Sequence, residues 1–426
     1  MKVLMFGWEF PPFNKGGLGT ACLGLTKGLA NHGIDVSFVI PKAPKGIRHQ
    51  HVHLDLMVAN NIQSVQGEES TISFQEVNTL LAPYITEEEY LTRFASMKKS
   101  GLREVDQDDD EEVYGCNLYE EVVRYANKAS MIARNKDFDV IHAHDWMTYK
   151  AGISAKHYTG KPLVVHIHAT EFDRTGGNGV NQMVYDIERE GFHAADRILA
   201  VSNLTKNTVV RHYGVPEEKV EVVHNAVEFP SERVQCQSRI SETDKIVLFL
   251  GRITLQKGPD YFVEAARKVL DFQPDTTFVV AGSGDMEGRM MQRAAELGMS
   301  DKMLFTGFLR GPEIDKAYAM ADLYVMPSVS EPFGITPLES MRNGTPVLIS
   351  KQSGVSEVVT HALRCDFWDI NEMTNKILAV TSHDSLRQDL SENGEKEVHT
   401  FTWDVPAHKC VQAYKQVLSA PSITIR

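Results

Sequence analysis

The stretch IVLFLGRITLQKGPDYFVEAARKVL, residues 246–270, contains the unit from which the fold is built. Its first five residues, Ile246–Leu250, are all apolar and predict a strand that is buried on both faces. A short loop with two cations follows, and Pro259 then suits the first turn of a helix. Apolar residues recur on one face of that helix, at Phe262, Ala266, Val269 and Leu270. A buried strand followed by an amphipathic helix is typical of a parallel α/β sheet.

The same strand–helix unit recurs on both sides of this stretch. Downstream, the expected strands are Thr277–Ala281, Met303–Thr306, Leu323–Met326 and Pro346–Ile349. Upstream, they are Val3–Phe6, Val36–Ile40, Asp139–His144, Leu163–His168, Arg197–Val201 and Val220–His224. The alternation lapses between 227 and 244, where the composition is that of a linker. We therefore expect an α/β protein of two Rossmann-like, doubly wound domains that face each other across a cleft.

The predicted boundaries follow from these lapses in the pattern. An N-terminal domain covers 1–228 and includes an excursion at about 45–115, which is polar, lacks periodicity and is expected to be partly helical. A C-terminal domain covers 229–402, and a terminal helix at 403–426 could pack back on the first domain. A chain of 426 residues is long enough for two such cores.

Charge and cysteine content exclude several classes of function. The formal net charge of −13 argues against nucleic acid or an anionic membrane as the main partner. Part of the excess lies in the run DQDDDEE at 106–112, which is typical of a solvated loop. The five cysteines form no CxxC pair, which disfavours both a disulfide framework and a zinc site. The N-terminus has too short an apolar run for a signal peptide, and no integral membrane segment is predicted, so we expect a cytoplasmic protein.

Two of the predicted strand ends carry groups that suit phosphate. Gly16 and Gly17 precede a helix and can bring backbone N–H groups close to an anion, although such turns are common. Arg252 and Lys257 lie between a strand and a helix start. Two cations beside a helix N-terminus suit a diphosphate whose negative charge grows as it leaves.

Histidines follow two neighbouring strands, in IHAHDW at 141–146 and HIHATEFD at 166–173. Two interpretations compete. The histidines and an aspartate could bind a metal that activates water in a hydrolase. They could instead line a pocket for sugar hydroxyls. The metal interpretation needs further ligands at hydrolase-like spacing, and the sequence does not provide them, so we expect no metal.

The segment SEPFGITPLESM, 330–341, places Glu331 and Glu339 eight positions apart in an otherwise uncharged setting. Gly334 ends an extended segment, and the helix is expected to begin at about Thr336. Glu331 would then lie before the turn and Glu339 inside the helix. Both carboxylates can point into one cleft from different heights.

Taken together, these motifs resemble the retaining glycosyltransferases of the GT-B fold. The resemblance covers most of the chain outside the excursion and is strongest to glycosyltransferase family 4 and to glycogen and starch synthase-like members. The motifs that carry it, in chain order, are GGLG, HAHDW, the segment from ADRILAVSN to HNAVE, the GR-x4-KG loop and E-P-F-G-x3-L-E. Five motifs in the family's order are far more specific than any one of them.

The resemblance implies a role for each matched residue. Arg252 and Lys257 match the residues that hold the donor diphosphate, and Gly17, beside Gly16, matches the glycine that faces the phosphates. Glu339 matches the glutamate that binds the nucleotide ribose, and His168 matches a histidine that contacts the sugar. Glu331 matches the glutamate near the transferred sugar. The remaining matches are Phe333, Gly334 and Ile335 for backbone N–H groups, Phe308 and Leu309 beside the base, and Asp145 and Asn225 on the sugar or acceptor side. Catalysis would rest on His168, Glu331, Arg252 and Lys257, with no metal and no cofactor besides the donor.

The implied function is transfer of a hexose, with glucose favoured, from UDP- or ADP-sugar to an α-1,4-glucan. Bacterial ADP-glucose synthases carry Lys-Thr before the two glycines, whereas this chain has Asn14-Lys15, and they tend to lack the second glutamate. The nucleotide therefore stays open, and so do the acceptor and the linkage. The alternatives are a family 4 enzyme with another acceptor, as in sucrose synthesis or polysaccharide assembly, a sugar-nucleotide epimerase, and a metal-dependent hydrolase.

Overall fold

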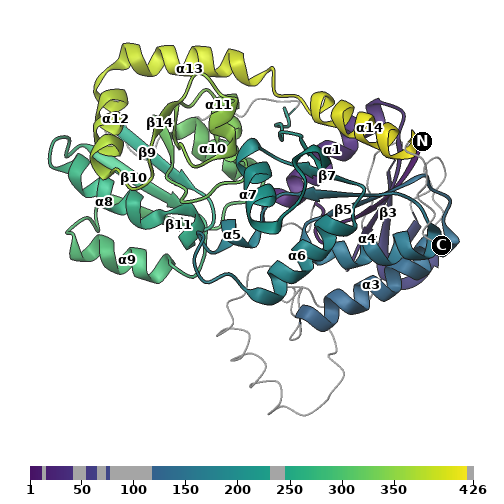
Figure 1. Cartoon of the computed structure of the whole chain (residues 1–426). Coiled ribbons are helices and arrows are strands. Elements are labelled where there is room, and N and C mark those ends of the chain that lie inside the picture. Colours follow the sequence, from purple (N-terminus) through teal and green to yellow (C-terminus); the bar gives the residue numbers. More distant parts are fainter. Residues whose placement is uncertain (12–15, 42–53, 65–72, 77–117, 231–244, 420–426) are drawn as a thin grey trace.

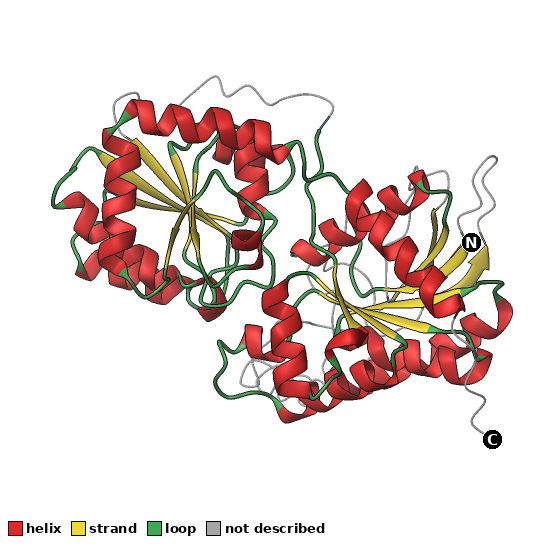
Figure 2. Ribbon diagram, turned by 45° about the horizontal axis from the view of Figure 1, so that its top comes forward, coloured by secondary structure: helices red, strands yellow, loops and turns green. Residues whose placement is uncertain are grey.

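The computed structural model describes residues 1–11, 16–41, 54–64, 73–76, 118–230 and 245–419. They form two α/β domains that lie next to each other (Figure 1). In each domain, helices cover both faces of one central sheet (Figure 2). The acidic run at 106–112 lies outside the described residues.

Within the described residues, the first sheet has eight strands in the order β4-β3-β2-β1-β5-β6-β7-β8. Their bounds are β1 Lys2–Phe6, β2 Asp35–Ile40, β3 Leu54–Ser64, β4 Ser73–Glu76, β5 Val140–His144, β6 Leu163–Ile167, β7 Arg197–Ala200 and β8 Val220–Val222. Neighbouring strands pair in parallel, except that β4 runs antiparallel to β3 at the edge. The chain builds outward on one side of β1 and then returns to start β5 on the other side. Strands β1 and β5 therefore mark the switch point of this domain.

Helices connect these strands and cover the sheet. Their bounds are α1 Gly17–Asn31, α3 Leu118–Asn135, α4 Trp146–Thr159, α5 Glu171–Arg174, α6 Gln182–Ala194 and α7 Asn203–Tyr213. The ends of α7 illustrate how local sequence sets a helix. The Ser202 side chain accepts a hydrogen bond from the Thr205 N–H at the start, and Gly214, at φ 66°, ends the helix in the left-handed conformation.

The second sheet is parallel throughout, in the order β11-β10-β9-β12-β13-β14. Its strands are β9 Lys245–Leu250, β10 Thr276–Ala281, β11 Met303–Gly307, β12 Leu323–Met326, β13 Val347–Ser350 and β14 Leu363–Cys365. Its helices are α8 Pro259–Leu270, α9 Glu287–Glu296, α10 Pro312–Met320, α11 Thr336–Arg342, α12 Ile370–Ser382 and α13 Asp384–Val398. Here the switch point lies between β9 and β12.

Every strand predicted from an apolar run is present, with ends that differ by at most two residues. The prediction missed β14, because three residues with an arginine in the middle give no recognisable apolar run. It also missed β3 and β4, which are the described parts of the excursion that was expected to be partly helical. The rest of that excursion lies outside the described residues.

The last helix, α14 Asp404–Ser419, packs on α1 of the first domain (Figure 1). Two glycines of α1 allow this contact. A Cβ at Gly24 would lie 2.1 Å from the Trp403 ring, and one at Gly28 would lie 2.4 Å from the Trp403 carbonyl oxygen. At both positions, any side chain would force the two helices apart. Trp403 is consequently buried in the core of the first domain.

The chain passes between the domains twice, at adjacent places. The Val227 N–H donates to the Phe401 carbonyl oxygen at 3.1 Å, which ties the first crossing to the second. Arg342 of α11 donates to the Glu228 carbonyl oxygen, and the Glu228 carboxylate forms an ion pair with Lys27 of α1 at 2.6 Å. Among the described helices, none is both long and apolar enough to cross a membrane.

Candidate functional site

The candidate residues gather at the carboxyl ends of the strands, around the two switch points. In the second domain, the loop after β9 carries Arg252 and Lys257, and the loop after β12 carries Glu331. In the first domain, the loop after β1 leads to Gly16 and Gly17, and Asp145 follows β5. Open parallel sheets bind ligands at such places because the loops on either side of the switch diverge and leave a crevice.

The loop after β9 forms one 3₁₀ turn, Leu255–Lys257, and then turns into α8 at Gly258. Gly258 has φ 61°, and a Cβ there would lie 2.3 Å from the Pro327 carbonyl oxygen, so a side chain is excluded. The buried side chain of Gln256 accepts a hydrogen bond from Arg252 Nη2 at 2.9 Å. The Gln256 carbonyl oxygen accepts from the Val329 N–H at 2.9 Å, which fastens this loop to the one after β12.

Lys257 and Glu331 form an ion pair through Nζ and Oε2. Both side chains are largely buried, with 18% and 9% of their surfaces exposed. Ser328 Oγ lies 3.4 Å from the same carboxylate oxygen, and the Glu331 N–H donates to the Gln352 carbonyl oxygen at 2.9 Å. The lysine that the resemblance assigns to the diphosphate is therefore neutralised by the glutamate that it assigns to the sugar. An arriving anion could take the place of Glu331 on this cation.

The turn after Glu331 is built around Gly334, which has φ 98°. Its position would place a Cβ only 3.1 Å from Cγ of Glu331, so glycine keeps that carboxylate in place. Phe333 is buried, and Ile335 is the N-cap of α11. In the part of the chain that the structure describes, the N–H groups of Phe333, Gly334 and Ile335 donate to no backbone carbonyl oxygen. The resemblance assigns these N–H groups to the donor, and that assignment stays a prediction.

The second glutamate of the motif has a different set of partners. Glu339 Oε2 accepts a hydrogen bond from the Tyr318 hydroxyl at 3.3 Å. Burial raises the pKa of Glu339, and the nearby Arg342 guanidinium opposes that shift. Because Glu331 pairs with Lys257 while Glu339 faces Tyr318, the two carboxylates do not act on each other as an acid/base couple would.

At the first switch point, a carboxylate that the sequence analysis did not select occupies the start of α1. Glu9 is buried, and its Oε1 accepts a hydrogen bond from the Gly19 N–H at 2.7 Å. A Cβ on Gly17 would meet nothing within 4 Å, so this glycine borders open space. The sequence does contain a signal for Glu9, because it is the one acidic residue in an apolar segment that directly follows a strand. Asn14 and Lys15, which distinguish this chain from the bacterial synthases, lie outside the described residues.

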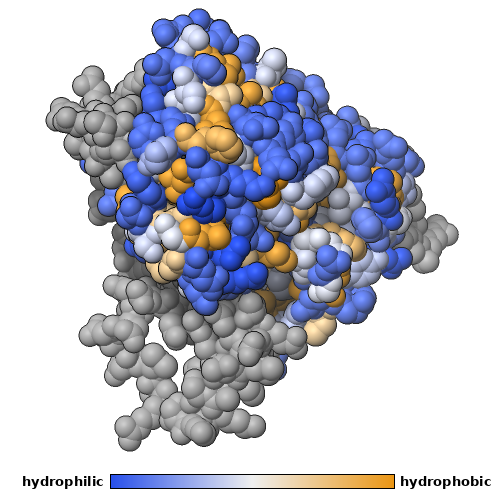
Figure 3. All heavy atoms as spheres, turned by 90° about the vertical axis from the view of Figure 1, so that its left-hand side faces the viewer, coloured by the Kyte–Doolittle hydropathy of each residue, from blue (hydrophilic) through white to orange (hydrophobic). Residues whose placement is uncertain are grey.

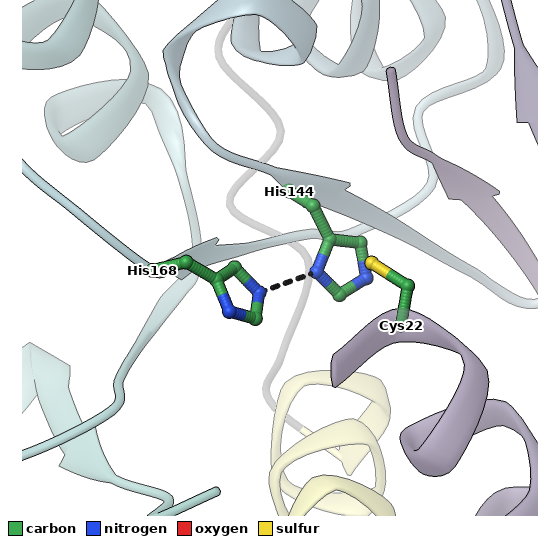
Figure 4. A group of neighbouring side chains, drawn as sticks. All are labelled: Cys22, His144 and His168. Atoms are coloured by element: carbon green, nitrogen blue, oxygen red, sulfur yellow. Dashed lines mark hydrogen bonds between the residues drawn. The ribbon is translucent and has the colours of Figure 1, made fainter. Parts of the chain in front are cut away.

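The four histidines expected at neighbouring strand ends do gather there. His142 and His144 of β5 stack with ring centroids 4.3 Å apart, and His166 and His168 stack at 4.5 Å. His144 Nδ1 lies 3.0 Å from His168 Nε2, with Cys22 of α1 beside them (Figure 4). Burial lowers the pKa of all four rings, that of His168 to about 3. The rings are therefore neutral near pH 7.

The geometry of these rings bears on the metal interpretation. The ring nitrogens of His142, His144 and His166 lie within 4.8 Å of one another, close enough to be considered as ligands. The rings of His142 and His166, however, are nearly parallel, with an interplanar angle of 11°. A metal lies in the plane of each imidazole that binds it, and stacked parallel rings do not share such a point, so His142 and His166 do not suit a common ion. Ligand atoms of Cys22, His144 and His168 form a second group within 4.8 Å of one another, to which this argument does not apply.

Asp145 orients the loop that carries His168. It is the one non-glycine residue with positive φ in the described chain, at 59°. Its Oδ1 accepts hydrogen bonds from the N–H groups of His168 at 2.7 Å and Ala169 at 3.3 Å. Burial raises the pKa of Asp145 to about 6. The resemblance places this residue on the sugar or acceptor side, and the structure directs its carboxylate to the backbone of His168.

The other predicted residues are more dispersed. Asn225 is buried beyond the end of β8. Phe308 is half-exposed after β11, where the Arg310 guanidinium lies 5.6 Å from its ring centroid, and Leu309 follows it. Strand β11 is two places from β9 in the sheet, so this pair lies on the same edge as Lys257 but apart from the Lys257–Glu331 ion pair.

Contacts between the domains bring the two strand edges together. Ser330 Oγ donates to Asp173 Oδ1 at 2.6 Å, which joins the residue before Glu331 to the helix after His168. Across another part of the interface, Glu357 accepts hydrogen bonds from the N–H groups of Asn203 and Leu204 at 2.9 and 2.8 Å. Partial burial acts to raise the pKa of Glu357, but the hydrogen bond with His224 and those from the two N–H groups outweigh it, so that this pKa is lowered. Sequence reasoning missed these partners, since no local pattern marks a contact between distant loops.

Family models match both halves of the chain. A model described as glycosyl transferases group 1 matches residues 231–397, and one described as glycosyltransferase family 4 matches 103–229. An uncharacterised glycosyltransferase of Methanocaldococcus jannaschii is 31% identical over 97% of this chain and 98% of its own. A glycogen synthase of Mycobacterium tuberculosis is 24% identical over 97% and 94%.

Solved structures share the fold. A sucrose-phosphate synthase of Thermosynechococcus elongatus superimposes with a TM-score of 0.75 at 18% identity and covers 99% of this chain and all of its own. The Anabaena protein HepE, solved in complex with UDP-glucose, gives a TM-score of 0.65 at 15% identity, covering 98% of this chain and all of its own. At these identities the likeness establishes the two-domain architecture alone.

Proposed function

The chain belongs to the GT-B glycosyltransferases of group 1 and family 4, and on that basis we propose that it transfers glucose from UDP- or ADP-glucose to an α-1,4-glucan with retention of anomeric configuration. The observation that carries the proposal is the Lys257–Glu331 ion pair at the β9/β12 switch point. The pair supports the proposal because a cation and a carboxylate side by side suit a leaving diphosphate and the hydroxyls of its sugar.

In the proposed reaction, the donor diphosphate binds Lys257 and Arg252, and this frees Glu331 to accept hydrogen bonds from the sugar. As the bond between the anomeric carbon and the diphosphate oxygen breaks, negative charge grows on the diphosphate and strengthens its interaction with both cations. No metal or further cofactor is required in this proposal, because the two side chains supply the positive charge.

Retention by front-face substitution fits the surroundings of Asp145. The acceptor hydroxyl attacks from the face that the diphosphate leaves, and its proton passes to the departing phosphate oxygen. A double displacement would need a free carboxylate on the opposite face of the sugar. Oδ1 of Asp145 is committed to two backbone N–H groups, so this residue is a poor nucleophile. Neutral His168 can instead bond a sugar hydroxyl.

The test is product analysis with both donors. The purified chain is incubated with UDP-glucose or ADP-glucose and maltoheptaose, and nucleoside diphosphate release and chain length are followed together. We expect equimolar diphosphate and added glucosyl units, with α-anomeric signals for the new linkage by proton NMR. Free glucose would indicate hydrolysis, an altered donor sugar would indicate epimerisation, and β-anomeric signals would refute retention. Transfer to other acceptors but not to maltoheptaose would contradict only the proposed α-1,4-glucan acceptor.

A further inference from the structure

An exposed tryptophan lies on the same edge of the second sheet as the donor loops. Trp368 follows β14, and β14 pairs with β13 so that Cys365 lies beside Ser350. The segment that continues from Ser350 reaches Gln352, whose carbonyl oxygen accepts the Glu331 N–H. The loops after β9, β12, β13 and β14 therefore form one continuous edge, with the ion pair near its centre and Trp368 at its end.

Trp368 differs from the other tryptophans of this chain in its exposure. Its exposed fraction is 57%, whereas the other three tryptophans, Trp8, Trp146 and Trp403, are between 3% and 6% exposed. The outer face of the second domain is mainly hydrophilic, with hydrophobic residues in small patches (Figure 3). A tryptophan ring combines a large apolar face with a polar N–H, which suits contact with a ligand that has both apolar and polar surface.

The ring is also held in a fixed orientation. Phe367 meets Trp368 edge-on with centroids 4.8 Å apart, and Tyr261 braces Phe367 in the same way at 5.1 Å. The backbone turns tightly beneath it, because the Asp369 N–H donates to the Asp366 carbonyl oxygen at 3.0 Å. Asp369 then caps α12 through the Glu372 N–H at 2.8 Å. Trp368 thus stands on a rigid turn, where an immobilised ring loses little entropy on binding.

Hydrogen-bonding groups suited to hydroxyls lie on the turn that carries Trp368 and on the adjoining loop after β13. Asp366 accepts from Lys351 Nζ and from Gln352 Nε2, both at 2.9 Å. Gln352 Oε1 in turn lies 3.0 Å from Ser350 Oγ and 3.4 Å from the Phe367 N–H. A pyranose ring has an apolar C–H face, which an indole can cover, and a rim of hydroxyls, which carboxylate, amide and ammonium groups can bond.

We propose that Trp368, with Lys351, Asp366 and Gln352, forms a subsite for a pyranose unit of the acceptor glycan, several units away from the reacting end. This proposal rests on the proposed function only in that the acceptor is a glycan. A chain that reaches both the ion pair and Trp368 must have several units, so the subsite favours long acceptors. It binds the already formed part of the chain and takes no part in the transfer step.

Intrinsic fluorescence provides a direct test, because Trp368 is the exposed tryptophan of the four. Emission is titrated, without donor, with maltoheptaose, cellohexaose and mannohexaose in turn. We expect a saturable change in emission with at least one of them and none in Trp368→Ala. The absence of a change with all three oligosaccharides overturns the proposal, as does a change that persists in Trp368→Ala.

Substitutions then distinguish a loss of glycan binding at Trp368 from a general loss of folding. In gels containing glycogen or another polymer of the responding sugar, Trp368→Ala should be retarded at least fivefold less than wild type, and Trp368→Phe should recover most of the retardation. Phe272→Ala is the matched control, since Phe272 is a 76% exposed aromatic beyond the opposite end of α8. Equal retardation of Trp368→Ala and wild type overturns the subsite.

Kinetics distinguish the failure of this proposal from the failure of the proposed function. We expect Trp368→Ala to raise KM about fivefold for a heptasaccharide acceptor and to leave kcat/KM for the trisaccharide unchanged. Equal effects on both acceptors would overturn the subsite and leave the glucosyl transfer intact. A fluorescence response without any transfer from UDP- or ADP-glucose would overturn the glucosyl transfer and leave the subsite intact.

Discussion

The two switch points of this molecule differ in the ionisable side chains that they carry. At the β9/β12 point, the functional groups form a largely buried ion pair between Lys257 and Glu331. At the β1/β5 point and along β6, the groups are imidazoles whose pKa values burial lowers, so that they are neutral. The same architecture therefore provides a cation–carboxylate pair in the second domain and a group of neutral imidazoles, beside the carboxylates of Glu9 and Asp145, in the first. A diphosphate needs the first, and sugar hydroxyls need the second.

The largest effect is expected from removing the cation of the cation–carboxylate pair. Lys257→Ala should lower kcat by about 10²–10³-fold, because the departing diphosphate loses a preorganised positive charge. Turnover at saturating donor is the measurement, with a thermal melt to verify folding. Lys268→Ala is the control, since Lys268 lies on the surface of α8 and bonds Asn371. A kcat within twofold of wild type would contradict the proposed role of Lys257 in stabilising the departing diphosphate.

Glu339 tests whether the carboxylates of the second domain act as a clamp or as an acid/base couple. Glu339→Ala should weaken nucleotide binding about tenfold, which corresponds to about 1.4 kcal/mol for a lost hydrogen bond to a charged group. Its kcat at saturating donor should change little. Calorimetric titration with the nucleoside diphosphate measures the affinity, with Glu264→Ala, an exposed partner of Arg293, as control. Unchanged affinity combined with a large rate loss would instead favour a catalytic couple.

The neutral imidazoles predict a specific dependence of stability on pH. His166 is buried, and its pKa is lowered well below 6.5. Below pH 6.5, therefore, this side chain binds a proton in the unfolded chain but not in the folded chain. Stability from this group is complete above pH 6.5 and is lost as the pH falls below that value. His166→Leu should therefore reduce the slope of unfolding free energy against pH by about 1.4 kcal/mol per pH unit near pH 5.

Asp145 provides a control of opposite sign for the same measurement. Its pKa is raised from 3.8 to about 6, so the folded state binds the proton more tightly and stability is lost as the pH rises from about 4 to 6. Asp145→Asn should remove that loss, which amounts to about 3 kcal/mol. Urea denaturation at several pH values measures both variants. Parallel slopes in wild type and His166→Leu would contradict a buried neutral imidazole.

The smallest effect is expected at the contact that joins the two domains. Ser330→Ala removes the hydrogen bond to Asp173, which is worth about 1–2 kcal/mol, and leaves Asp173 bonded to Thr170. We expect kcat/KM for the donor to fall about threefold to tenfold, because the contact that holds the two domains in this arrangement is weakened. Ser356→Ala, which removes a hydroxyl bonded to the Ser353 carbonyl oxygen within the second domain, should be nearly silent. Equal effects of both substitutions would argue against a role for the domain contact.

Sequence reasoning succeeded where a pattern is local. Parallel strands that are buried on both faces are continuous apolar runs, and Pro259 and Gly258 mark a helix start in any context. It failed where a contact depends on which strands become neighbours. Lys257 and Glu331 are 74 positions apart and meet only because β12 lies beside β9. The candidate role of Trp368 was likewise not predictable, because nothing in the sequence shows that its ring stays exposed at the end of β14.

The packing of α14 on α1 has a consequence for how the protein is made. The first domain cannot complete its core until residues 404–419 have left the ribosome, since Trp403 fills the surface above Gly24 and Gly28. At about 5–20 residues per second, the roughly 190 residues between 230 and 419 take about 10–40 s to synthesise. During that interval the nascent first domain presents an uncovered apolar strip while the second domain folds. A chaperone that recognises apolar surface would find its target there, and truncation of the last helix would leave that strip uncovered for the life of the protein.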